Sequence, residues 1–296
     1  MLDYPALSAV AAVVREGSFE RAAGALGITP SAVSQRVRAL EERLGAVLVV
    51  RGQPCRATDL GRTLCAHLDR VRLLEGEVAL LLPPSAGNAD DRLPLKVAVN
   101  SDSLATWFPS AAAAFSQAAD TPLDLTLDDE AHTADRLRSG EVLAAVTADP
   151  RPVQGCRTLR LGALRYLACA SPEFAARFFR GGVTRETLSS APCLRFDRRD
   201  RLQARWAREA LGFEFDAPVY TVASTHAFLD FALAGLAWGM QPEALAAPHL
   251  AHGRLVELVP GQPLDITLYW TVARLPVSAL PRLTDAVCQA ASKGLV

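Results

Sequence analysis

The chain has 296 residues, of which half are apolar, and its formal net charge is −1. This length suggests two or three domains with sizeable cores, and the near-neutral charge argues against nonspecific wrapping of nucleic acid. No window approaches the about 20 apolar residues of a membrane span, and no basic-then-apolar leader is present, so we expect a cytoplasmic protein with no membrane partner.

The first recognisable pattern is a pair of short helices joined by a tight turn over residues 17–40. Ala22, Ala23 and Leu26 form the apolar side of the first helix, and Gly27 stands where the chain must reverse. In the second helix, Thr29–Leu40, Thr29 is expected to cap the N-terminus and Pro30 suits the first helical position. The inward positions at helical spacing are Val33, Val37 and Leu40, and the outward ones are Ser31, Ser34, Gln35 and Arg38.

A short helix with a small polar face, held by a tight turn, fits the DNA major groove. The motif from Phe19 to Arg38 therefore predicts a helix-turn-helix and double-stranded DNA as a partner. Residues 36–62 carry six Arg against three acidic residues, which places positive charge on the second helix and on the segment that follows it.

A heptad pattern follows, with steps of four and three residues, at Leu60, Leu64, His67, Val71, Leu74, Val78 and Leu81. Such a seam requires a partner helix, and we expect homodimerisation through it. The alternative is a helix that packs within its own chain. Pro83-Pro84 ends the pattern, and a polar linker leads to residue 95.

From Leu95 onward, strand and helix patterns alternate, which predicts parallel α/β units. The first unit has strands at Leu95–Asn100, Leu123–Asp128 and Leu143–Thr147, with helices at Ser103–Ala118 and His132–Gly140. The second has strands at Arg165–Ala170, Cys193–Asp197, Val219–Ala223 and Ala237–Gln241, with helices near Pro172–Phe179, Thr184–Ser190, Leu202–Leu211 and Thr225–Ala234. A strand at Ile266–Ala273 and a helix at Val277–Ala291 complete the chain.

Several motifs resemble one family, the LysR-type transcriptional regulators. Beyond the helix-turn-helix, the matching segments are Leu44-Gly45, Leu48–Arg51 and Thr58–Gly61. Segments further along look like the branch of that family that senses basic amino acids, the ArgP/LysG type: Val97–Trp107, Arg165–Leu167, Gly239-Met240 and Leu268–Trp270.

The resemblance implies an overall α/β fold with three parts. These are a winged helix-turn-helix domain (residues 1–58), a dimerising linker helix followed by a polar linker segment (59–94), and a periplasmic-binding-protein-like effector domain (95–296). The effector domain would comprise two α/β subdomains, about 95–163 with 268–296, and about 164–267. The resemblance alone also implies a homotetramer of paired dimers.

The expected DNA-binding residues are Thr29, Pro30, Ser31, Ser34, Gln35, Arg36, Arg38 and Arg51. Bases and phosphates would be contacted from the helix, and Arg51 in the wing would reach the minor groove or the backbone. Many family members carry Arg where Gln35 stands, so adenine readout through the Gln35 amide is expected at that position.

The expected effector site lies beyond the carboxyl ends of the strands, at helix N-termini. The polar candidates for an α-carboxylate and the opposite wall are Asn100, Ser101, Ser103, Thr106, Thr147, Ser224, Thr225 and His226. The acidic candidates for a cationic group are Asp102, Asp128, Asp129, Glu130 and Asp197. The alternative for each of these residues is an ordinary helix cap or a solvated turn.

With the branch resemblance, these groups predict a lysine or arginine effector, in a regulator of amino-acid export or metabolism. The alternatives are a regulator that senses another small carboxylate, and a solute-binding protein. No nucleophile-elbow, zincin, dinucleotide or Walker motif is present, so no catalytic residue and no cofactor are expected. The six cysteines have no metal-ligand spacing, so no metal site is expected.

Overall fold

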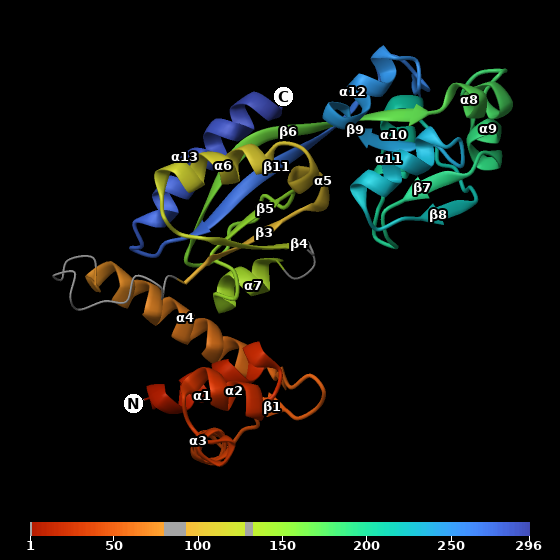
Figure 1. Cartoon of the computed structure of the whole chain (residues 1–296). Coiled ribbons are helices and arrows are strands. Elements are labelled where there is room, and N and C mark those ends of the chain that lie inside the picture. The colour runs from red at the N-terminus through yellow and green to blue at the C-terminus, as the bar shows by residue number, and fades with distance from the viewer. Residues whose placement is uncertain (1, 80–92, 128–132) are drawn as a thin grey trace.

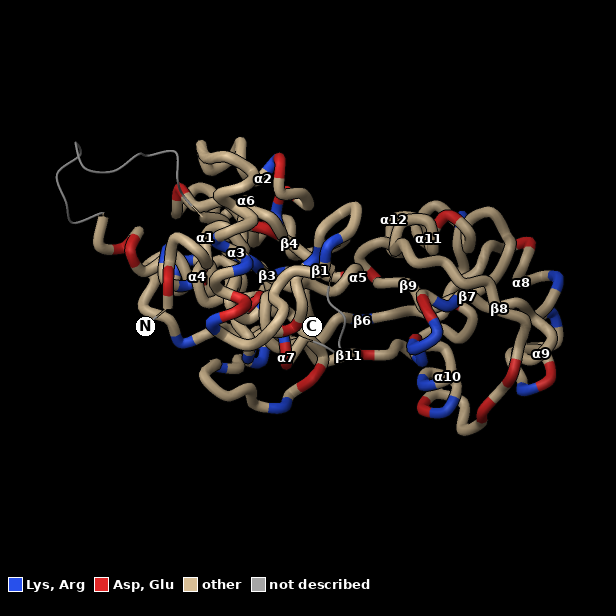
Figure 2. The backbone as a smooth tube through the Cα atoms, turned by 90° about the horizontal axis from the view of Figure 1, so that it is seen from below, with Lys and Arg blue, Asp and Glu red and all other residues tan. Residues whose placement is uncertain are grey.

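The computed structural model describes residues 2–79, 93–127 and 133–296. A small helical domain lies at one end, a long helix leads away from it, and two α/β lobes follow side by side (Figure 1). Acidic and basic positions are interspersed along the backbone (Figure 2), and their nearly equal numbers give the small net charge. Among the described residues, no helix combines the length and apolar character needed to cross a bilayer.

The N-terminal domain consists of three helices and a two-stranded wing. The helices are α1 (Tyr4–Glu16), α2 (Phe19–Leu26) and α3 (Pro30–Leu44), and the wing strands β1 (Val49–Val50) and β2 (Arg56–Ala57) pair antiparallel. Each helix contributes buried apolar residues to one shared cluster, including Val33, Val37 and Leu40 of α3. Because this cluster fixes one face of α3, the opposite face is left to solvent.

The two helices of the predicted motif begin and end where the sequence indicates. Ser18 caps α2 and Thr29 caps α3, with the Thr29 hydroxyl accepting a hydrogen bond from the Ala32 amide at 3.2 Å. Gly27 adopts the left-handed conformation, with φ of 64°, that the turn requires. The predicted helix-turn-helix is confirmed, and α3 continues one turn beyond the predicted Leu40.

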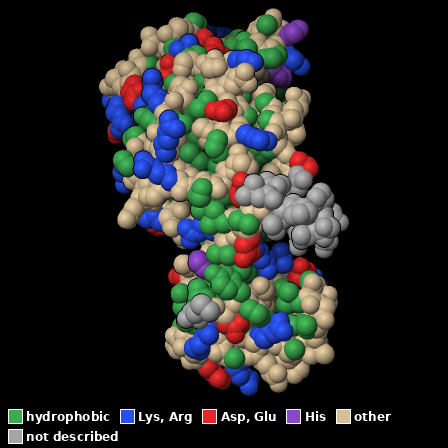
Figure 3. All heavy atoms as spheres, turned by 90° about the vertical axis from the view of Figure 1, so that its left-hand side faces the viewer, with side chains coloured by type: hydrophobic (Ala, Val, Ile, Leu, Met, Phe, Trp, Pro, Cys, Tyr) green, Lys and Arg blue, Asp and Glu red, His purple; other side chains and the backbone are tan. Residues whose placement is uncertain are grey.

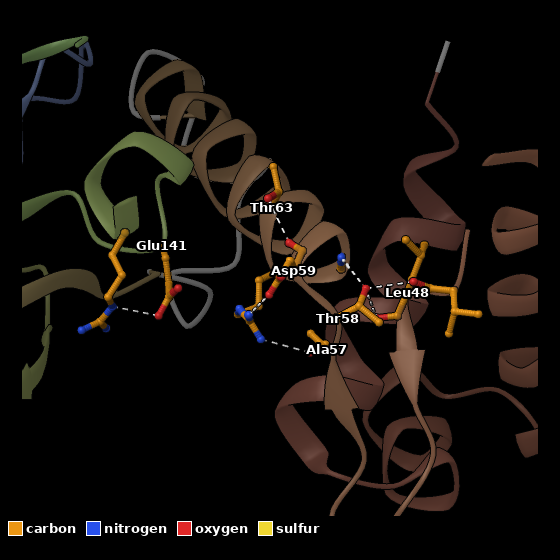
Figure 4. Close-up of polar contacts among 10 residues, drawn as sticks. Leu48, Ala57, Thr58, Asp59, Thr63 and Glu141 are labelled. Atoms are coloured by element: carbon orange, nitrogen blue, oxygen red, sulfur yellow. Dashed lines mark hydrogen bonds and ion pairs between the residues drawn. The ribbon is translucent and has the colours of Figure 1, made fainter. Parts of the chain in front are cut away.

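The long helix α4 (Asp59–Ala79) is anchored to the wing at its first turn. The Thr58 hydroxyl donates to the carbonyls of Val47 and Leu48 and accepts from the Gly61 amide at 3.1 Å (Figure 4). Gly61 is needed here, because a Cβ at this position would lie 2.2 Å from the Leu48 carbonyl oxygen. The helix axis is therefore fixed relative to the DNA-binding domain.

The main sheet of the C-terminal half has the strand order β10-β6-β11-β5-β3-β4, and β9 also pairs with β6. Its first lobe holds β3 (Leu95–Val99), β4 (Leu123–Leu127) and β5 (Ala144–Thr147), which are mutually parallel where they pair. Helices α6 (Phe108–Ala118) and α13 (Ala279–Gly294) cover one face, and α7 (Thr133–Ser139) lies on the other (Figure 1).

Two long antiparallel strands join the lobes. β6 (Cys156–Ala170) pairs with β11 (Leu264–Ala273) over its first two thirds, with a register shift at Leu268/Tyr269. The end of β6 then pairs with β9 (Gly239–Pro242) and β10 (Val256–Glu257) in the second lobe. We propose that the subdomain boundaries lie on this pair of strands, near residues 163 and 268.

The second lobe is built around β6, β9 and a small parallel sheet. That sheet pairs β7 (Cys193–Arg195) with β8 (Val219–Thr221), and a bridge between Cys193 and Trp238 links it to the segment before β9. The helices of this lobe are α8 (Pro172–Phe178), α9 (Arg185–Ser190), α10 (Leu202–Trp206), α11 (Thr225–Leu233) and α12 (Glu243–Ala251).

Three local expectations need correction. The single helix expected at Ser103–Ala118 is two helices, α5 (Ser101–Ala105) and α6, because Pro109 lacks the amide that would continue the first. The strand expected at Arg165–Ala170 begins at Cys156, since its first half is held by the distant β11. The segment expected as one helix at Leu202–Leu211 changes after Trp206 into a π-helical turn.

The heptad seam on α4 is used in two ways. Leu64 packs on the core of the DNA-binding domain, His67 stacks on Tyr4 with ring centroids 6.4 Å apart, and Leu74 packs on the core of the first lobe. Leu60 and Val78 are exposed. Leu81 and the linker lie outside the described residues.

Polar contacts also tie α4 to the first lobe. The Lys96 ammonium lies 2.7 Å from the Asp69 carboxylate, and the Arg70 guanidinium donates to the Ser139 carbonyl at 3.0 Å. Glu77 accepts from both the amide and the hydroxyl of Ser278. The two ends of the molecule narrow to this connection, with charged and apolar side chains around it (Figure 3).

Candidate functional site

The exposed face of α3 carries most of the residues predicted to contact DNA. Thr29, Pro30, Ser31, Gln35, Arg36 and Arg38 are exposed, and Ser34 is half-buried. Within the described residues, no hydrogen bond or ion pair occupies the side chains of Gln35, Arg36 or Arg38. These groups are free to bond an external partner, as major-groove readout requires.

Arg51 lies beside the wing and is oriented by an aromatic ring. Its guanidinium sits over the Phe19 ring, 5.0 Å from the centroid. Phe19 is the first residue of α2, so this stacking joins the wing to the start of the helix-turn-helix. The sequence placed Arg51 in the wing but gave no sign of its contact with Phe19.

The centre of the predicted effector site is the Asp102 carboxylate, which joins the two lobes. One oxygen accepts from the Tyr166 hydroxyl at 2.6 Å, and the other accepts from the Thr225 hydroxyl at 2.7 Å. The Ser101 hydroxyl lies 2.8 Å from the Thr225 hydroxyl. Helix α5 of the first lobe and helix α11 of the second therefore meet through a continuous polar network.

The electrostatics of Asp102 are those of a carboxylate held away from water. Burial raises the pKa of Asp102, and the charge of Asp200 adds to that effect, while the hydrogen bonds from Tyr166 and Thr225 oppose it. A cation placed beside this carboxylate would favour its ionised form. The network thus offers a partly buried acid that lacks a cationic partner among the described residues.

The other polar residues at this edge of the first lobe serve the local fold. Asn100 caps α5 by accepting from the Ser103 amide at 2.8 Å, and the buried Ser103 hydroxyl accepts from the Trp107 indole at 3.0 Å. Thr106 donates to the Asp102 carbonyl within the helix. Thr147, at the end of β5, accepts from the Asp149 amide.

In the second lobe, three of the residues expected to bind the effector (Asp197, Ser224 and His226) make no hydrogen bond to the Asp102 network among the described residues. Asp197 is exposed and accepts from the amides of Arg199 and Asp200, which makes it part of a turn. Ser224 caps α11, and His226 is exposed on that helix. Asp128, Asp129 and Glu130 lie outside the described residues.

Two residues that affect Asp102 were missing from the sequence-based set: Tyr166, which bonds it, and Asp200, which acts on it only through charge. Tyr166 lies within a segment that the family resemblance quoted, but nothing in the pattern placed its hydroxyl beside Asp102. Asp200 lies three residues after the candidate Asp197 and was not itself a candidate. Its half-buried carboxylate accepts from the amides of Phe196 and Leu202, and its charge reaches Asp102.

Within the described residues, no group of His, Cys, Asp and Glu side chains is arranged to hold a metal ion. The described side chains at the two candidate sites are mainly carboxylates, hydroxyls and arginines. These groups bind and orient other molecules by charge and hydrogen bonding.

Two family descriptions match this chain. The bacterial regulatory helix-turn-helix protein of the lysR family matches residues 5–62, and the LysR substrate binding domain matches residues 88–293. The chain belongs to the LysR family of transcriptional regulators. The N-terminal domain accordingly corresponds to the family's helix-turn-helix domain, and the C-terminal α/β domain corresponds to the family's substrate-binding domain.

Relatives across the full length define the branch of the LysR family. The regulator ArgP of Pseudomonas aeruginosa PAO1 is 43% identical over 297 residues, covering 100% of this chain and 98% of the relative. The regulator LysG of Mycobacterium tuberculosis H37Rv is 44% identical over 292 residues, covering 98% and 94%. The predicted ArgP/LysG resemblance is confirmed.

Solved structures of LysR-family relatives superpose along the whole chain. ArgP from Mycobacterium tuberculosis matches with a TM-score of 0.83 at 42% identity, covering 100% of this chain and 99% of that one. Full-length LysG from Corynebacterium glutamicum with bound effector Arg matches with a TM-score of 0.72 at 40% identity, covering 99% of each. The expected fold, a helix-turn-helix, a long helix and an α/β effector domain, is confirmed.

Proposed function

We propose that this LysR-type regulator responds to a basic amino acid, lysine or arginine, bound between α5 and α11. The observation that carries the proposal is the Asp102 carboxylate of α5, which accepts hydrogen bonds from Tyr166 of β6 and from Thr225 of α11. A relative that covers the full chain was solved with effector Arg bound. The LysG and ArgP relatives support the same ligand class.

In this proposal the cation of the effector pairs with Asp102, in place of a hydroxyl donor from Tyr166 or Thr225. The α-carboxylate lies at the other end of the effector, and Ser224 and His226 at the start of α11 are the candidates to bond it. Because Asp102 bridges α5 and α11, a ligand that changes its bonds changes the contact between the lobes. The remaining acids, Asp128, Asp129, Glu130 and Asp197, stay candidates for the cationic end.

Calorimetric titration of the full chain with the twenty amino acids tests this function. We expect measurable binding for lysine or arginine, and none for norleucine or citrulline, which lack the side-chain charge. Equal affinity for lysine and norleucine would refute a cationic ligand. Preferred binding of an uncharged or acidic amino acid would favour another small carboxylate as effector.

We also propose that α4 forms the dimer and that the exposed face of α3 reads the operator. Leu60 and Val78 are exposed among the described residues, so part of the heptad seam is left for a second copy to cover. Two helix-turn-helix units would then address two half-sites. Pairing of dimers into a tetramer is part of this proposal.

A further inference from the structure

An arginine-lined hollow of about 470 Å³ is formed in the DNA-binding domain by residues outside α3. It forms where the turn between α1 and α2, the wing and the first turn of α4 meet. Among the described residues that line it, Arg15, Arg21, Arg56 and Arg62 are basic and Glu16 is acidic. The net charge of the lining is therefore strongly positive.

Close backbone packing shapes this hollow. The Cys55 amide donates to the Gly17 carbonyl at 2.7 Å, which fixes the wing against the α1–α2 turn. Gly17 has φ of 71°, and a Cβ there would lie 2.9 Å from the Pro54 Cβ and 3.1 Å from Nη2 of Arg21. Glycine at this position thus lets both the wing and the Arg21 guanidinium close over the turn.

The four arginines differ in how they are neutralised. Arg62 pairs with Asp59 and donates to the Ala57 carbonyl, and the acceptor residues of these bonds are labelled in Figure 4. Arg15 lies 3.8 Å from the Glu16 carboxylate. Arg21 and Arg56 are exposed, and their side chains have no ion pair or hydrogen bond in the part of the chain that the structure describes. Two unneutralised guanidinium groups therefore face one hollow.

We propose that this hollow binds a backbone phosphate of the DNA duplex, with Arg21 and Arg56 as its ligands. In a helix-turn-helix the first helix crosses the DNA backbone while the second lies in the major groove, and Arg21 is on that first helix, α2. The planar guanidinium fork matches phosphate oxygens in charge and geometry. The site is distinct from the α3 residues and from Arg51, whose guanidinium is stacked on Phe19.

The first experiment measures DNA binding by the double variant Arg21→Gln, Arg56→Gln. The probe is a duplex selected by the parent protein from a random library, and affinity is measured over a range of salt concentrations. We expect about tenfold weaker binding on every sequence tested. The slope of log K against log salt should become shallower by about 0.9 for each half-site, because one phosphate contact is lost in each.

Two controls separate charge from fold. Arg180→Gln removes an exposed arginine of the second lobe and should leave affinity and slope unchanged. The variant Arg21→Lys, Arg56→Lys keeps both charges and should restore the slope. A double Gln variant with the parent's salt slope, or with a loss confined to particular base pairs, would overturn the assignment.

The second experiment removes the phosphate charge instead. Single methylphosphonates are placed along the duplex, and we expect one position in each half-site to weaken binding by the parent but not by the double Gln variant. Absence of such a position would overturn the proposal. Titration with inorganic phosphate, without DNA, tests whether the hollow binds a free phosphate ion instead. If the double Gln variant lost tight phosphate binding but kept its DNA affinity, the proposal would also be overturned.

Discussion

The DNA-binding domain and the effector domain differ in how far apart in the sequence the residues of their candidate sites lie. The candidate DNA contacts run from Thr29 to Arg51, and all but Arg51 lie on or at the start of one helix. The Asp102 network instead joins groups up to 124 positions apart, such as Ser101 and Thr225. A site on one amphipathic helix follows from local periodicity, whereas a site between two lobes depends on how distant strands and helices pack.

The largest expected effect comes from the joint between the wing and α4. Gly61→Ala places a Cβ against the Leu48 carbonyl, whose oxygen also accepts from Thr58, so the wing must move. We expect the DNA-binding domain to lose about 3 kcal/mol of stability, together with DNA affinity. Denaturant unfolding and a DNA-binding assay measure both quantities.

A matched control lies on the same helix. A Cβ at Gly76 meets nothing within 4 Å, so Gly76→Ala should stabilise α4 by about 0.5–1 kcal/mol. If both variants had the same stability, the close packing at Gly61 would not be what fixes α4 to the wing.

The next largest effect is expected on dimerisation, at the positions of α4 that do not pack against the described part of the chain. Val71 is half-buried and Val78 exposed, and neither packs against a core cluster of the described residues. Placing Glu at both positions would bury like charges in a dimer seam, so we expect monomers and much weaker DNA binding. Sedimentation velocity measures the assembly state.

Ala79→Glu adds the same charge one position beside the seam and should leave the assembly unchanged. A double Glu variant that still sediments as a dimer and keeps its DNA affinity would show that α4 is not the main interface. In that case the packing of Leu64, His67 and Leu74 within the chain would account for most of the heptad pattern.

The effector domain can be tested at Asp102. Asp102→Asn keeps the size of the side chain and removes the charge, so we expect about a hundredfold weaker binding of lysine or arginine by calorimetry. Glu173→Gln, on an exposed position of α8, serves as the control. Equal losses in the two variants would assign no special role to the network between the lobes.

The pH dependence of the same titration sharpens this test. Burial raises the pKa of Asp102, so the folded protein takes up a proton more readily than the unfolded chain does. The ionised carboxylate therefore costs stability at pH values above its ordinary pKa. A cationic ligand needs that ionised form, so its affinity should fall as the pH falls through the raised pKa, and this dependence should vanish in Asp102→Asn.

The same contrast explains which structural features the sequence predicts. The cap at Thr29, the turn at Gly27 and the buried Val33, Val37 and Leu40 all follow from residues within a few positions of one another. Strand patterns also located most of the α/β elements, because each is locally apolar. What local patterns could not supply were pairings over long separations: the first half of β6 against β11, and Tyr166 beside Asp102.

Helix α12 shows a different limit. Its sequence contains Pro248 in the interior, and its apolar residues do not gather on one face, so neither of the usual helix signals is present. It forms because the adjoining β9 is held against β6, and Ala246 is buried in the cluster beneath it. Tertiary packing here overrides a weak local preference.

The smallest expected effect distinguishes base readout from backbone contact within the DNA-binding domain. Gln35 is exposed on α3 with a free amide, and a bidentate amide–adenine contact contributes about 1–3 kcal/mol of discrimination. Gln35→Ala should therefore relax preference at one base pair. Arg51→Ala should instead weaken binding to all sequences alike and make the salt dependence shallower, because a phosphate contact carries no base information. Binding to a library of sites at two salt concentrations separates the two outcomes, and an unchanged base preference in Gln35→Ala would assign the readout to other residues of α3.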